Sequence, residues 1–537
     1  MPEWKYEKTF EKLFCRNKVL SSSEITVGIR SEHPKCNETN ARNIIRTARR
    51  KNVIDRIPDI VIGHNEYLYY VRTTGEKYTK KDVRACLCRD IRLATLIGSF
   101  EKNQGILSYL DICKISACST QKKTGHVMGI ERIKQIISYI YPCRVVSLEN
   151  TFFFVSEQEY PIGNSRWFPL ASDQIKQAKL ECLMIRNVIY HMQKMNLIND
   201  TVPLYRNSKT PLKGIEYKYL MFDAMAYSSV PALNIQAASL EENDKGKDAI
   251  ILFDVHIWNA YESGHLKGFY DRVQIIRNAA KGEKKNVIPI VAAMEIQENV
   301  RRSCRNMGIL TYQFSDIYGS KINEILKLYD RIQETDSREP AEGNTNSIGQ
   351  LLEMLENTGQ GENLENLRGT LFEFLMHSVL YKWLRGQLTG NLITNYKINY
   401  DDNKKLVYEY DIIAPLYDEY LVIELKGYAN SHFFRWGNKE ESGKYEKETL
   451  GWFFRNTFPV AQKYYAHNPD NKKVKACFIT TAHFDKEAKE QLGQIGKGKL
   501  KSAYMEVAYD GKELYHKLKT LKMSYEAEIL KRYYLNR

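Results

Sequence analysis

Two carboxylates and a lysine in the last third of the chain have the types and spacing needed for metal-assisted cleavage of a phosphodiester bond. Asp411 lies in one apolar, strand-like segment, and Glu424 and Lys426 lie in the next; the Glu-x-Lys triplet at 487–489 lacks such a context. Two carboxylates can hold Mg²⁺ through oxygen ligands and leave positions for water and phosphate. The metal then polarises the phosphoryl oxygen and lowers the pKa of bound water. A lysine beside them would position that water or stabilise the developing negative charge.

Two paired strands are predicted to bring these three side chains together. The segments 406–414 and 420–427 are joined by a turn of a few residues, so they should pair antiparallel. With the turn centred between positions 417 and 418, residues whose numbers sum to 835 face one another, and Asp411 and Glu424 are such a pair. Facing residues have Cβ atoms about 4.5–5.5 Å apart on one side of the sheet. The lysine, two residues further along, emerges on the same side. A buried ion pair without catalytic function is the alternative.

The expected helix at 367–375 adds a third acid. Glu373 stands among apolar residues there, and a buried carboxylate needs a partner. A helix acid, then an Asp strand, then a Glu-x-Lys strand resembles the PD-(D/E)XK (restriction-endonuclease-like) nuclease superfamily over residues 362–485, although no proline precedes Asp411. The resemblance implies a restriction-endonuclease-like α/β fold and Mg²⁺-dependent hydrolysis of phosphodiester bonds, with Mn²⁺ as a substitute. It also implies that Glu373 helps Asp411 and Glu424 to bind the metal or its water.

The middle of the chain repeats this order of elements with other residues. A helix carries Glu181, a strand carries Asp223, and the next strand carries Asp254 and His256. We interpret the region as a second, divergent copy of the fold, with the histidine in place of the lysine. Because a neutral imidazole cannot supply a lysine's charge at pH 7, we expect an inactive domain that serves in DNA binding or dimerisation. An active variant that uses Asp223, Asp254 and His256, and an unrelated α/β module, are the alternatives.

The N-terminal region is predicted to be a winged helix-turn-helix. Three helices precede two β-rich pieces, 59–62 and 67–71, which turn through 63–65. Residues 21–24 should start the second helix, and Asn37 or Thr39 should cap the third. The third helix carries a basic face suited to a DNA major groove, formed by Arg42, Arg46, Arg49, Arg50 and Lys51. A solvated cationic face without a ligand is the alternative.

The next 80 residues repeat that plan more weakly. One helix is expected to begin at Ile106, another spans 130–140, and a wing of two strands turns at 149–150. Its basic residues are Lys122, Lys123, Arg132 and Lys134. We interpret this segment as a second winged-helix-like domain, which could serve in partner binding or packing instead of DNA binding.

These segments predict a multidomain architecture that combines α/β and α+β folds. Two winged-helix domains, 1–78 and 79–164, precede the divergent nuclease-like domain at 165–334. A polar linker with one short helix follows at 335–361, and the nuclease domain occupies 362–537.

Charge and composition narrow the class of partner. The chain has 537 residues with 79 Lys+Arg against 65 Asp+Glu, and residues 1–160 hold 27 Lys+Arg against 18 Asp+Glu, a net charge of +9. Such an excess favours a polyanion, with double-stranded DNA first. The apolar runs are strand-sized, far below the roughly 20 residues that span a bilayer, so no membrane partner is expected. The 10 cysteines lack the paired spacing of a zinc site, and we expect reduced thiols in the cytoplasm.

The sequence thus predicts a metal-dependent DNA endonuclease whose winged helices locate duplex DNA, by analogy in restriction or another prokaryotic defence system. The alternatives are a non-catalytic DNA-binding regulator or scaffold, and a structure- or RNA-directed nuclease. One site cuts one strand, so double-strand cleavage would need a homodimer or a working middle domain. No phosphate-binding Gly-x-x-x-x-Gly-Lys-Ser/Thr loop is present, so ATP-driven translocation is not expected.

Overall fold

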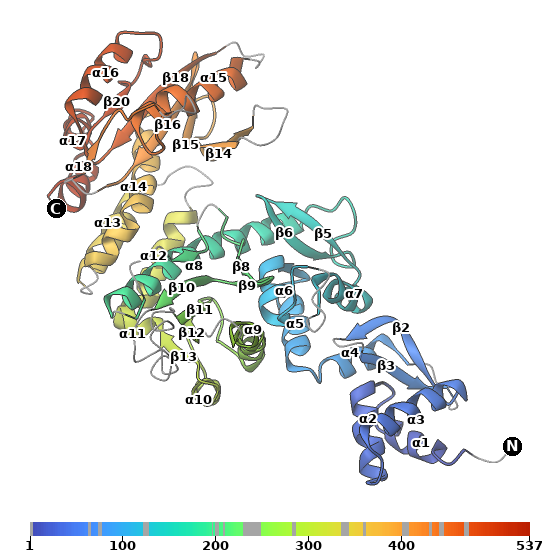
Figure 1. Cartoon of the computed structure of the whole chain (residues 1–537). Helices are drawn as coiled ribbons and strands as arrows, with labels where there is room; N and C mark the ends of the chain where they lie inside the picture. The colour runs from blue at the N-terminus through green and yellow to red at the C-terminus, as the bar shows by residue number, and fades with distance from the viewer. Residues whose placement is uncertain are drawn as a thin grey trace. The chain divides into compact units, whose positions relative to one another are not determined.

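The chain is a mixed α/β protein that divides into two compact units, Met1–Ile317 and Tyr318–Arg537 (Figure 1). A computed structural model describes residues 4–62, 66–72, 78–121, 128–195, 197–198, 203–207, 210–228, 249–281, 286–334, 343–357, 361–399, 407–428, 432–439, 445–466 and 472–536. No helix within these ranges has a stretch long and apolar enough to cross a bilayer.

The first unit begins with three helices and a three-stranded sheet. The elements are α1 (Glu7–Phe14), β1 (Leu20–Ser21), α2 (Ser22–Glu32), α3 (Glu38–Arg50), β2 (Ile54–Ile62) and β3 (Glu66–Val71). Ser21 accepts a hydrogen bond from the backbone N–H of Glu24, and Asn37 caps α3 in the same way, so both predicted helix starts are confirmed. Strand β3 lies between β1 and β2. The expected turn at 63–65 lies outside the described residues.

A second set of helices and strands repeats this connectivity. Its elements are α4 (Lys80–Leu87), α5 (Ile91–Lys102), β4 (Ile106–Ser108), α6 (Tyr109–Ser116), α7 (Ile130–Ile140), β5 (Cys143–Leu148) and β6 (Thr151–Ser156). The last strand again lies between the other two. The predicted wing is confirmed, and both of its turn residues, Glu149 and Asn150, adopt the left-handed backbone of a two-residue hairpin turn.

The helix that we expected to begin at Ile106 starts three residues later. Ile106, Leu107 and Ser108 pair with β6 as an edge strand. The Ser108 hydroxyl then accepts a hydrogen bond from the backbone N–H of Asp111, and this cap sets the start of α6 at Tyr109. The prediction of a helix start at Ile106 was therefore wrong, because a serine cap inside the apolar run was overlooked.

The first set of elements has its own hydrophobic core, and a second cluster joins its sheet to the next set of elements. Ile57 and Ile60 of β2 are buried in the same cluster as Ile133 and Ile137 of α7. Helix α7, the counterpart of α3, therefore lies against the neighbouring sheet, and one of its faces is used for packing.

The rest of the first unit is a five-stranded sheet with helices. Its elements are α8 (Trp167–Lys194), β7 (Leu204–Tyr205), β8 (Ile215–Tyr217), β9 (Leu220–Phe222), β10 (Ala224–Ser228), β11 (Ala249–His256), α9 (Ser263–Lys281), β12 (Val287–Ala293), α10 (Glu298–Asn306), β13 (Leu310–Gln313) and α11 (Phe314–Tyr318). The strand order is β13-β12-β11-β10-β7, and β8 and β9 form a separate pair. Strand β11 is buried from Ala249 to Val255, as is typical of a central strand covered on both faces.

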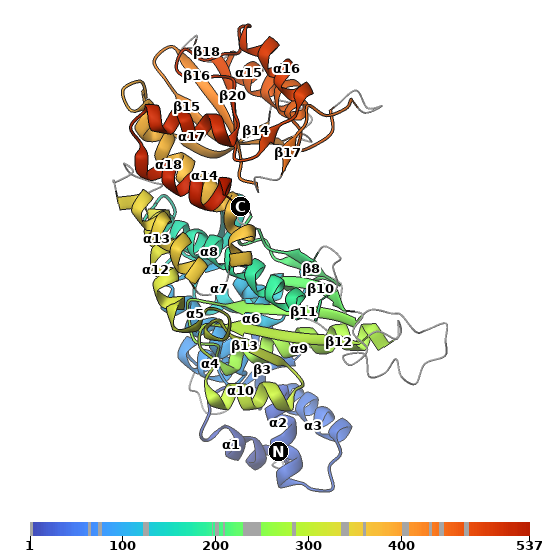
Figure 2. The same ribbon diagram turned by 90° about the vertical axis from the view of Figure 1, so that its left-hand side faces the viewer.

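The second unit holds another five-stranded sheet. Its main elements are α12 (Ile322–Glu334), α13 (Gly343–Asn357), α14 (Gly361–Leu384), β14 (Ile393–Asn399), β15 (Val407–Pro415), β16 (Glu419–Lys426), β17 (Phe433–Phe434), a π-helical turn (Trp452–Thr457), α15 (Phe458–Ala466), β18 (Lys473–Thr480), β19 (His483–Phe484), α16 (Lys486–Gly496), β20 (Ala508–Tyr509), α17 (Gly511–Thr520), α18 (Ser524–Leu530) and a second π-helical turn (Lys531–Leu535). The strand order is β14-β15-β16-β18-β20. Helices α15 and α16 share a hydrophobic core with one face of the sheet, and α14 and α17 lie on the other face (Figure 2).

Helix α12, which we assigned to the middle domain, packs in the second unit against α13. Helix α13 occupies much of the expected linker and is longer than the helix we expected there. Leu351, Leu352 and Leu355 on it are fully buried, so this part of the chain is packed. Residues 335–342 and 358–360 lie outside the described residues.

The two five-stranded sheets have the same topology. In each, a central strand (β11 or β16) has an antiparallel neighbour on one side (β10 or β15) and a parallel neighbour on the other (β12 or β18). An antiparallel edge strand and a parallel edge strand complete each sheet, and a long helix, α8 or α14, precedes it. The predicted repetition of elements between the middle and the end of the chain is confirmed at this level.

Candidate active site

The hairpin β15–β16 has the predicted register. Its recorded pairs run from Ile412 opposite Ile423 to Pro415 opposite Tyr420, and the residue numbers in every pair sum to 835. Continued by one residue, this register sets Asp411 opposite Glu424. The register could be predicted because the short turn leaves only one pairing that keeps the apolar residues of both strands in the core.

Lys426 lies between the two carboxylates. Its Nζ is 2.6 Å from Oε1 of Glu424 and 3.7 Å from Oδ2 of Asp411. The same Asp411 oxygen accepts a hydrogen bond of 2.8 Å from the backbone N–H of Leu425, which fixes the carboxylate over the end of β16. The side chains of Glu424 and Lys426 remain 19% and 25% exposed, so solvent and substrate can reach them.

The charge state of Lys426 follows from its surroundings. Burial opposes its positive charge, but the carboxylates of Glu424, Asp411 and, more weakly, Glu373 outweigh burial and raise the pKa of the ammonium. A lysine with a raised pKa cannot accept a proton near pH 7, so it cannot act as a general base. It can stabilise negative charge.

Glu373, on α14, belongs to this cluster through its charge. It is half-buried, and its carboxylate is near enough to Lys426 to raise the pKa of the lysine. Three carboxylates around one ammonium leave an excess of two negative charges, which a divalent cation would offset.

The donors around Lys426 fit Mg²⁺ or Mn²⁺ better than zinc, because all of them are oxygen atoms. They do not form a ready-made cage: within the described ranges, no three His, Cys, Asp or Glu side chains converge as metal ligands. Mg²⁺ keeps several waters and commonly uses one or two carboxylates together with substrate phosphate. Asp411 and Glu424 can supply those two carboxylates, with Glu373 at the margin of the site.

The corresponding position in the first unit has the same backbone arrangement. Ala224 lies opposite Phe253 in the β10–β11 pair, and continuing this register sets Asp223 opposite Asp254. Oδ2 of Asp223 accepts a hydrogen bond of 2.6 Å from the backbone N–H of Val255. Asp223 thus holds the end of β11 as Asp411 holds the end of β16.

The lysine of this second cluster is Lys114. The lysine lies on α6, and its Nζ is 2.6 Å from Oδ2 of Asp223 and 3.3 Å from Oδ1 of Asp254. It also donates to the carbonyl of Val255 at 3.1 Å. We looked for this charge on β11, at His256, and missed Lys114. The available indication was a lysine in a helix whose other side chains, apart from Asp111, are apolar or small, where a buried ammonium needs an anionic partner.

Two arginines and a tyrosine complete the neutralisation of these aspartates. Arg206 Nε lies 2.7 Å from Oδ1 of Asp223, as an ion pair without hydrogen-bond alignment. Arg272 lies 3.1 Å from Oδ1 of Asp254, and the Tyr261 hydroxyl donates to Oδ2 of Asp254 at 2.8 Å. Each carboxylate oxygen therefore has a cationic or hydrogen-bonding partner. The aspartates are at most 2% exposed, so a metal ion would have to displace several of these partners.

Glu181 and His256 lie beside this network. The Glu181 carboxylate pairs with Arg206 at 2.8 Å. Burial, and then the charge of Lys114, lower the pKa of His256 to about 4, so the imidazole is neutral at pH 7. The structure brings together Glu181, Asp223, Asp254 and His256, as the sequence predicted, but in a neutralised cluster that favours the inactive interpretation.

The basic face expected on α3 is exposed to solvent. Ala41, Ile45 and Ala48 are buried on its other side. The exposed residues are Arg42, Arg46, Arg49, Arg50 and Lys51. Among the described residues, Glu38 lies 2.5 Å from Arg42 and Asp55 lies 3.6 Å from Arg49.

The second winged-helix-like region offers no comparable face on α7, the counterpart of α3. Arg132 and Lys134 on α7 are half-buried, and Lys122 and Lys123 lie outside the described residues. The structure therefore gives α3 and α7 different environments, one open to a ligand and one used partly for packing.

Comparison of the chain with protein-family models, with characterised proteins and with solved structures finds no match.

Proposed function

We propose that the chain is a Mg²⁺-dependent endodeoxyribonuclease, with Mn²⁺ as a substitute, whose active site lies at the end of the β15–β16 hairpin. One observation carries the proposal: Asp411, Glu424 and Lys426 meet at a partly exposed strand end with more carboxylates than ammonium groups. Such a cluster is costly in electrostatic repulsion unless a cation joins it.

Each residue has a role that follows from its position. Asp411 and Glu424 would hold the metal, which when bound supplies Lewis-acid polarisation and a water of lowered pKa. Lys426, kept protonated by its neighbours, would donate hydrogen bonds to a phosphate oxygen as negative charge develops there. Glu373 would hold a metal-bound water at the margin of the site.

Duplex DNA would be bound by the N-terminal region through α3. Its arginines are exposed on one side of a helix that follows α2 in a helix-turn-helix, as a helix in the major groove requires. The second winged-helix-like region and the middle α/β region would serve as a scaffold. By analogy with enzymes that separate recognition from cleavage, we place the protein in restriction or another prokaryotic defence system, in the cytoplasm. A homodimer would supply the second site for double-strand cleavage.

The test is cleavage of supercoiled plasmid by the full chain with Mg²⁺, Mn²⁺ or EDTA. Lys426→Ala should abolish metal-dependent nicking or linearisation. Lys489→Ala is the matched control, since that lysine also ends a Glu-x-Lys triplet but is exposed on α16. Cutting that persists unchanged in Lys426→Ala would exclude this site.

A non-catalytic DNA-binding scaffold is the second candidate. The 2.6 Å ion pair between Lys426 and Glu424 favours it, because the same kind of pairing accompanies the neutralised cluster of the first unit. DNA binding with no metal-dependent cleavage of duplex DNA, branched DNA or RNA would support this candidate. Preferential cleavage of branched DNA or RNA would instead identify a structure- or RNA-directed nuclease.

A further inference from the structure

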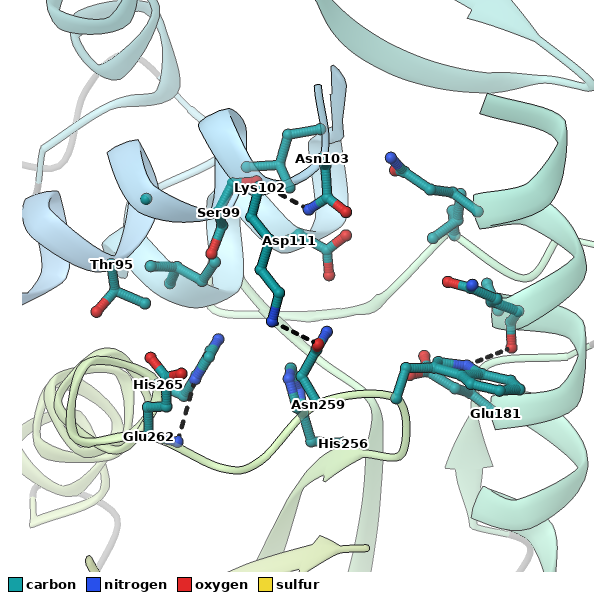
Figure 3. Close-up of a pocket in the computed structure, with 18 of the residues that line it drawn as sticks. Thr95, Ser99, Lys102, Asn103, Asp111, Glu181, His256, Asn259, Glu262 and His265 are labelled. Atoms are coloured by element: carbon teal, nitrogen blue, oxygen red, sulfur yellow. Dashed lines mark hydrogen bonds between the residues drawn. The ribbon is translucent and has the colours of Figure 1, made fainter. Parts of the chain in front are cut away.

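A pocket of about 460 Å³ opens beside the neutralised aspartates of the first unit (Figure 3). Lys102 at the end of α5, Asn103 directly after it and Asp111 on α6 line one side of the pocket. His256, Asn259 and His265 line it from the end of β11 through the start of α9. The second winged-helix-like region thus covers the end of β11. The corresponding strand end in the other sheet, that of β16, carries the candidate active site. A pocket of this size suits a small molecule.

The charges in the pocket disfavour an anionic ligand. Lys102 is the one lysine or arginine that lines it, and its Nζ is already bonded to Asn259 at 2.9 Å. Three carboxyl groups line the same pocket, those of Asp111, Glu181 and Glu262. No three metal-ligating side chains converge there or elsewhere in the described ranges, so a metal ion does not account for these acids either.

The remaining polar groups suit an uncharged ligand that both donates and accepts hydrogen bonds. Burial raises the pKa of Asp111, and it lowers the pKa of His265 to about 3, so the imidazole is neutral at pH 7. Asn103 and Gln174 add amide groups, and the Gln174 Oε1 is buried without a hydrogen-bond partner in the described structure. Neutral donors and acceptors of this kind discriminate ligands by the pattern of their polar edges.

Flat and apolar surfaces accompany these polar groups. The Trp258 ring lines the pocket, and its Nε1 donates to the carbonyl of Gln177 on α8 at 3.2 Å, which fixes the ring. Leu107, Ile115 and Ala178 supply apolar wall. A fixed indole beside amide and imidazole groups provides stacking for a planar ring together with hydrogen bonds to its edges.

We propose that this pocket binds an uncharged nucleobase, either in a free nucleoside or as an unpaired base of a DNA strand. The inference is independent of the proposed nuclease activity, because it concerns another sheet and requires neither metal nor cleavage. The ion pairs of Lys114 hold α6 against the sheet, so the pocket is formed before the ligand arrives.

The pocket can be blocked without disturbing its walls. Gly98 lines it from α5, and a Cβ added there would meet no atom within 4 Å. Gly98→Leu should therefore fill the opening while the helix remains intact. Gly493→Leu in α16 is the matched control, since its Cβ also enters open space but far from this pocket in the sequence and in the other unit. His256→Phe is a second variant that keeps a ring and removes the ring nitrogens.

The experiment is calorimetric titration of the full chain in EDTA with adenosine, guanosine, cytidine and thymidine. We expect at least one nucleoside to bind with a Kd of about 1 mM or tighter. Gly98→Leu should weaken binding by about tenfold or more and His256→Phe should weaken it measurably, while Gly493→Leu leaves it unchanged. No binding by any nucleoside, or binding that both pocket variants leave intact, would overturn the proposal.

Competition then identifies the source of the base. Displacement of the bound nucleoside by a single-stranded oligonucleotide of the same base, but not by ribose phosphate, would assign the pocket to bases within a strand. Failure of the oligonucleotide to compete would assign it to free nucleosides. Because both arms are run without metal, a negative result here is separate from a negative result in the cleavage assay.

Discussion

The carboxylate pairs of the two sheets have the same backbone setting but different electrostatic environments. In each pair, the first aspartate accepts a hydrogen bond from the backbone N–H that follows the second acid, at 2.8 Å for Asp411 and 2.6 Å for Asp223. In each, an ammonium lies 2.6 Å from one of the acids. The geometry of the hairpin therefore does not distinguish the two clusters.

The number and origin of the cations do distinguish them. Around Asp411, three carboxylates face one lysine, which comes from β16 itself. Around Asp223, the three carboxylates of Asp223, Asp254 and Glu181 face three cations from separate elements: Lys114, Arg206 and Arg272. The first cluster carries an excess of two negative charges and is partly open, whereas the second is neutral and closed. We therefore expect a paired-acid motif to bind a metal ion only where its charges are left uncompensated.

The largest effect should come from removing one acid of each pair. Asp411→Asn should lower metal-dependent cleavage by about a thousandfold, because it removes a metal ligand and the charge that the cation offsets. Asp254→Asn should leave the cleavage rate of the folded protein within about twofold of wild type. Plasmid cleavage by both variants measures the difference. Loss of cleavage in Asp254→Asn with an unchanged circular dichroism spectrum would show that the first unit also contains a working site.

For stability, the lysine of the first unit should matter more than the lysine of the second unit. Lys114→Met leaves two buried aspartates without their ammonium and should destabilise the first unit by about 3–5 kcal/mol. Lys426→Met, at a partly exposed site, should cost the second unit about 1 kcal/mol or less. Urea denaturation followed by near-ultraviolet circular dichroism would compare the variants. Equal destabilisation by both would contradict the view that only the neutral cluster around Asp223 is structural.

The sequence predicted the C-terminal cluster because its main determinants are local. Asp411, Glu424 and Lys426 lie within 16 residues, and one short turn fixes their register. The edge strand β14 was not predicted, because the local sequence pattern did not indicate a strand that pairs with the outer side of β15.

The cations around Asp223 and Asp254 could not be predicted in this way. Lys114 lies 109 residues before Asp223 and meets it only because α6 docks on a different sheet. Arg206 and Arg272 come from a segment beside β7 and from α9, so each contact depends on tertiary packing that no periodic pattern encodes. His256 has the spacing of the missing lysine, but spacing along one strand gave no information on a charge supplied from elsewhere.

The pH dependence of stability should also differ between the two units. The pKa of His256 is lowered to about 4, by burial first and the Lys114 charge second, from an ordinary value near 6.5. Between these values the unfolded chain binds more protons, so the stability that the neutral histidine contributes above pH 6.5 is lost as the pH falls toward 4, by about 3 kcal/mol. His256→Phe should reduce this loss in the first unit without abolishing it, because the pKa of His265 is lowered as well. If the stability of wild type and His256→Phe has the same pH dependence, this histidine does not cause the loss of stability at low pH.

The smallest effect tests whether α3 of the first unit binds DNA. If α3 binds the DNA backbone, Arg46→Ala should weaken duplex binding by about 1 kcal/mol and lower the slope of log K against log salt concentration by about 1. Arg132→Ala on α7 is the control, since that helix packs against β2 and its arginine is half-buried. Fluorescence anisotropy over a range of salt concentrations measures both quantities. If Arg132→Ala lowers the slope and Arg46→Ala does not, the DNA-binding face lies on the second winged-helix-like region. The first unit would then hold DNA near the pocket that we propose for a nucleobase, beside the neutralised carboxylates.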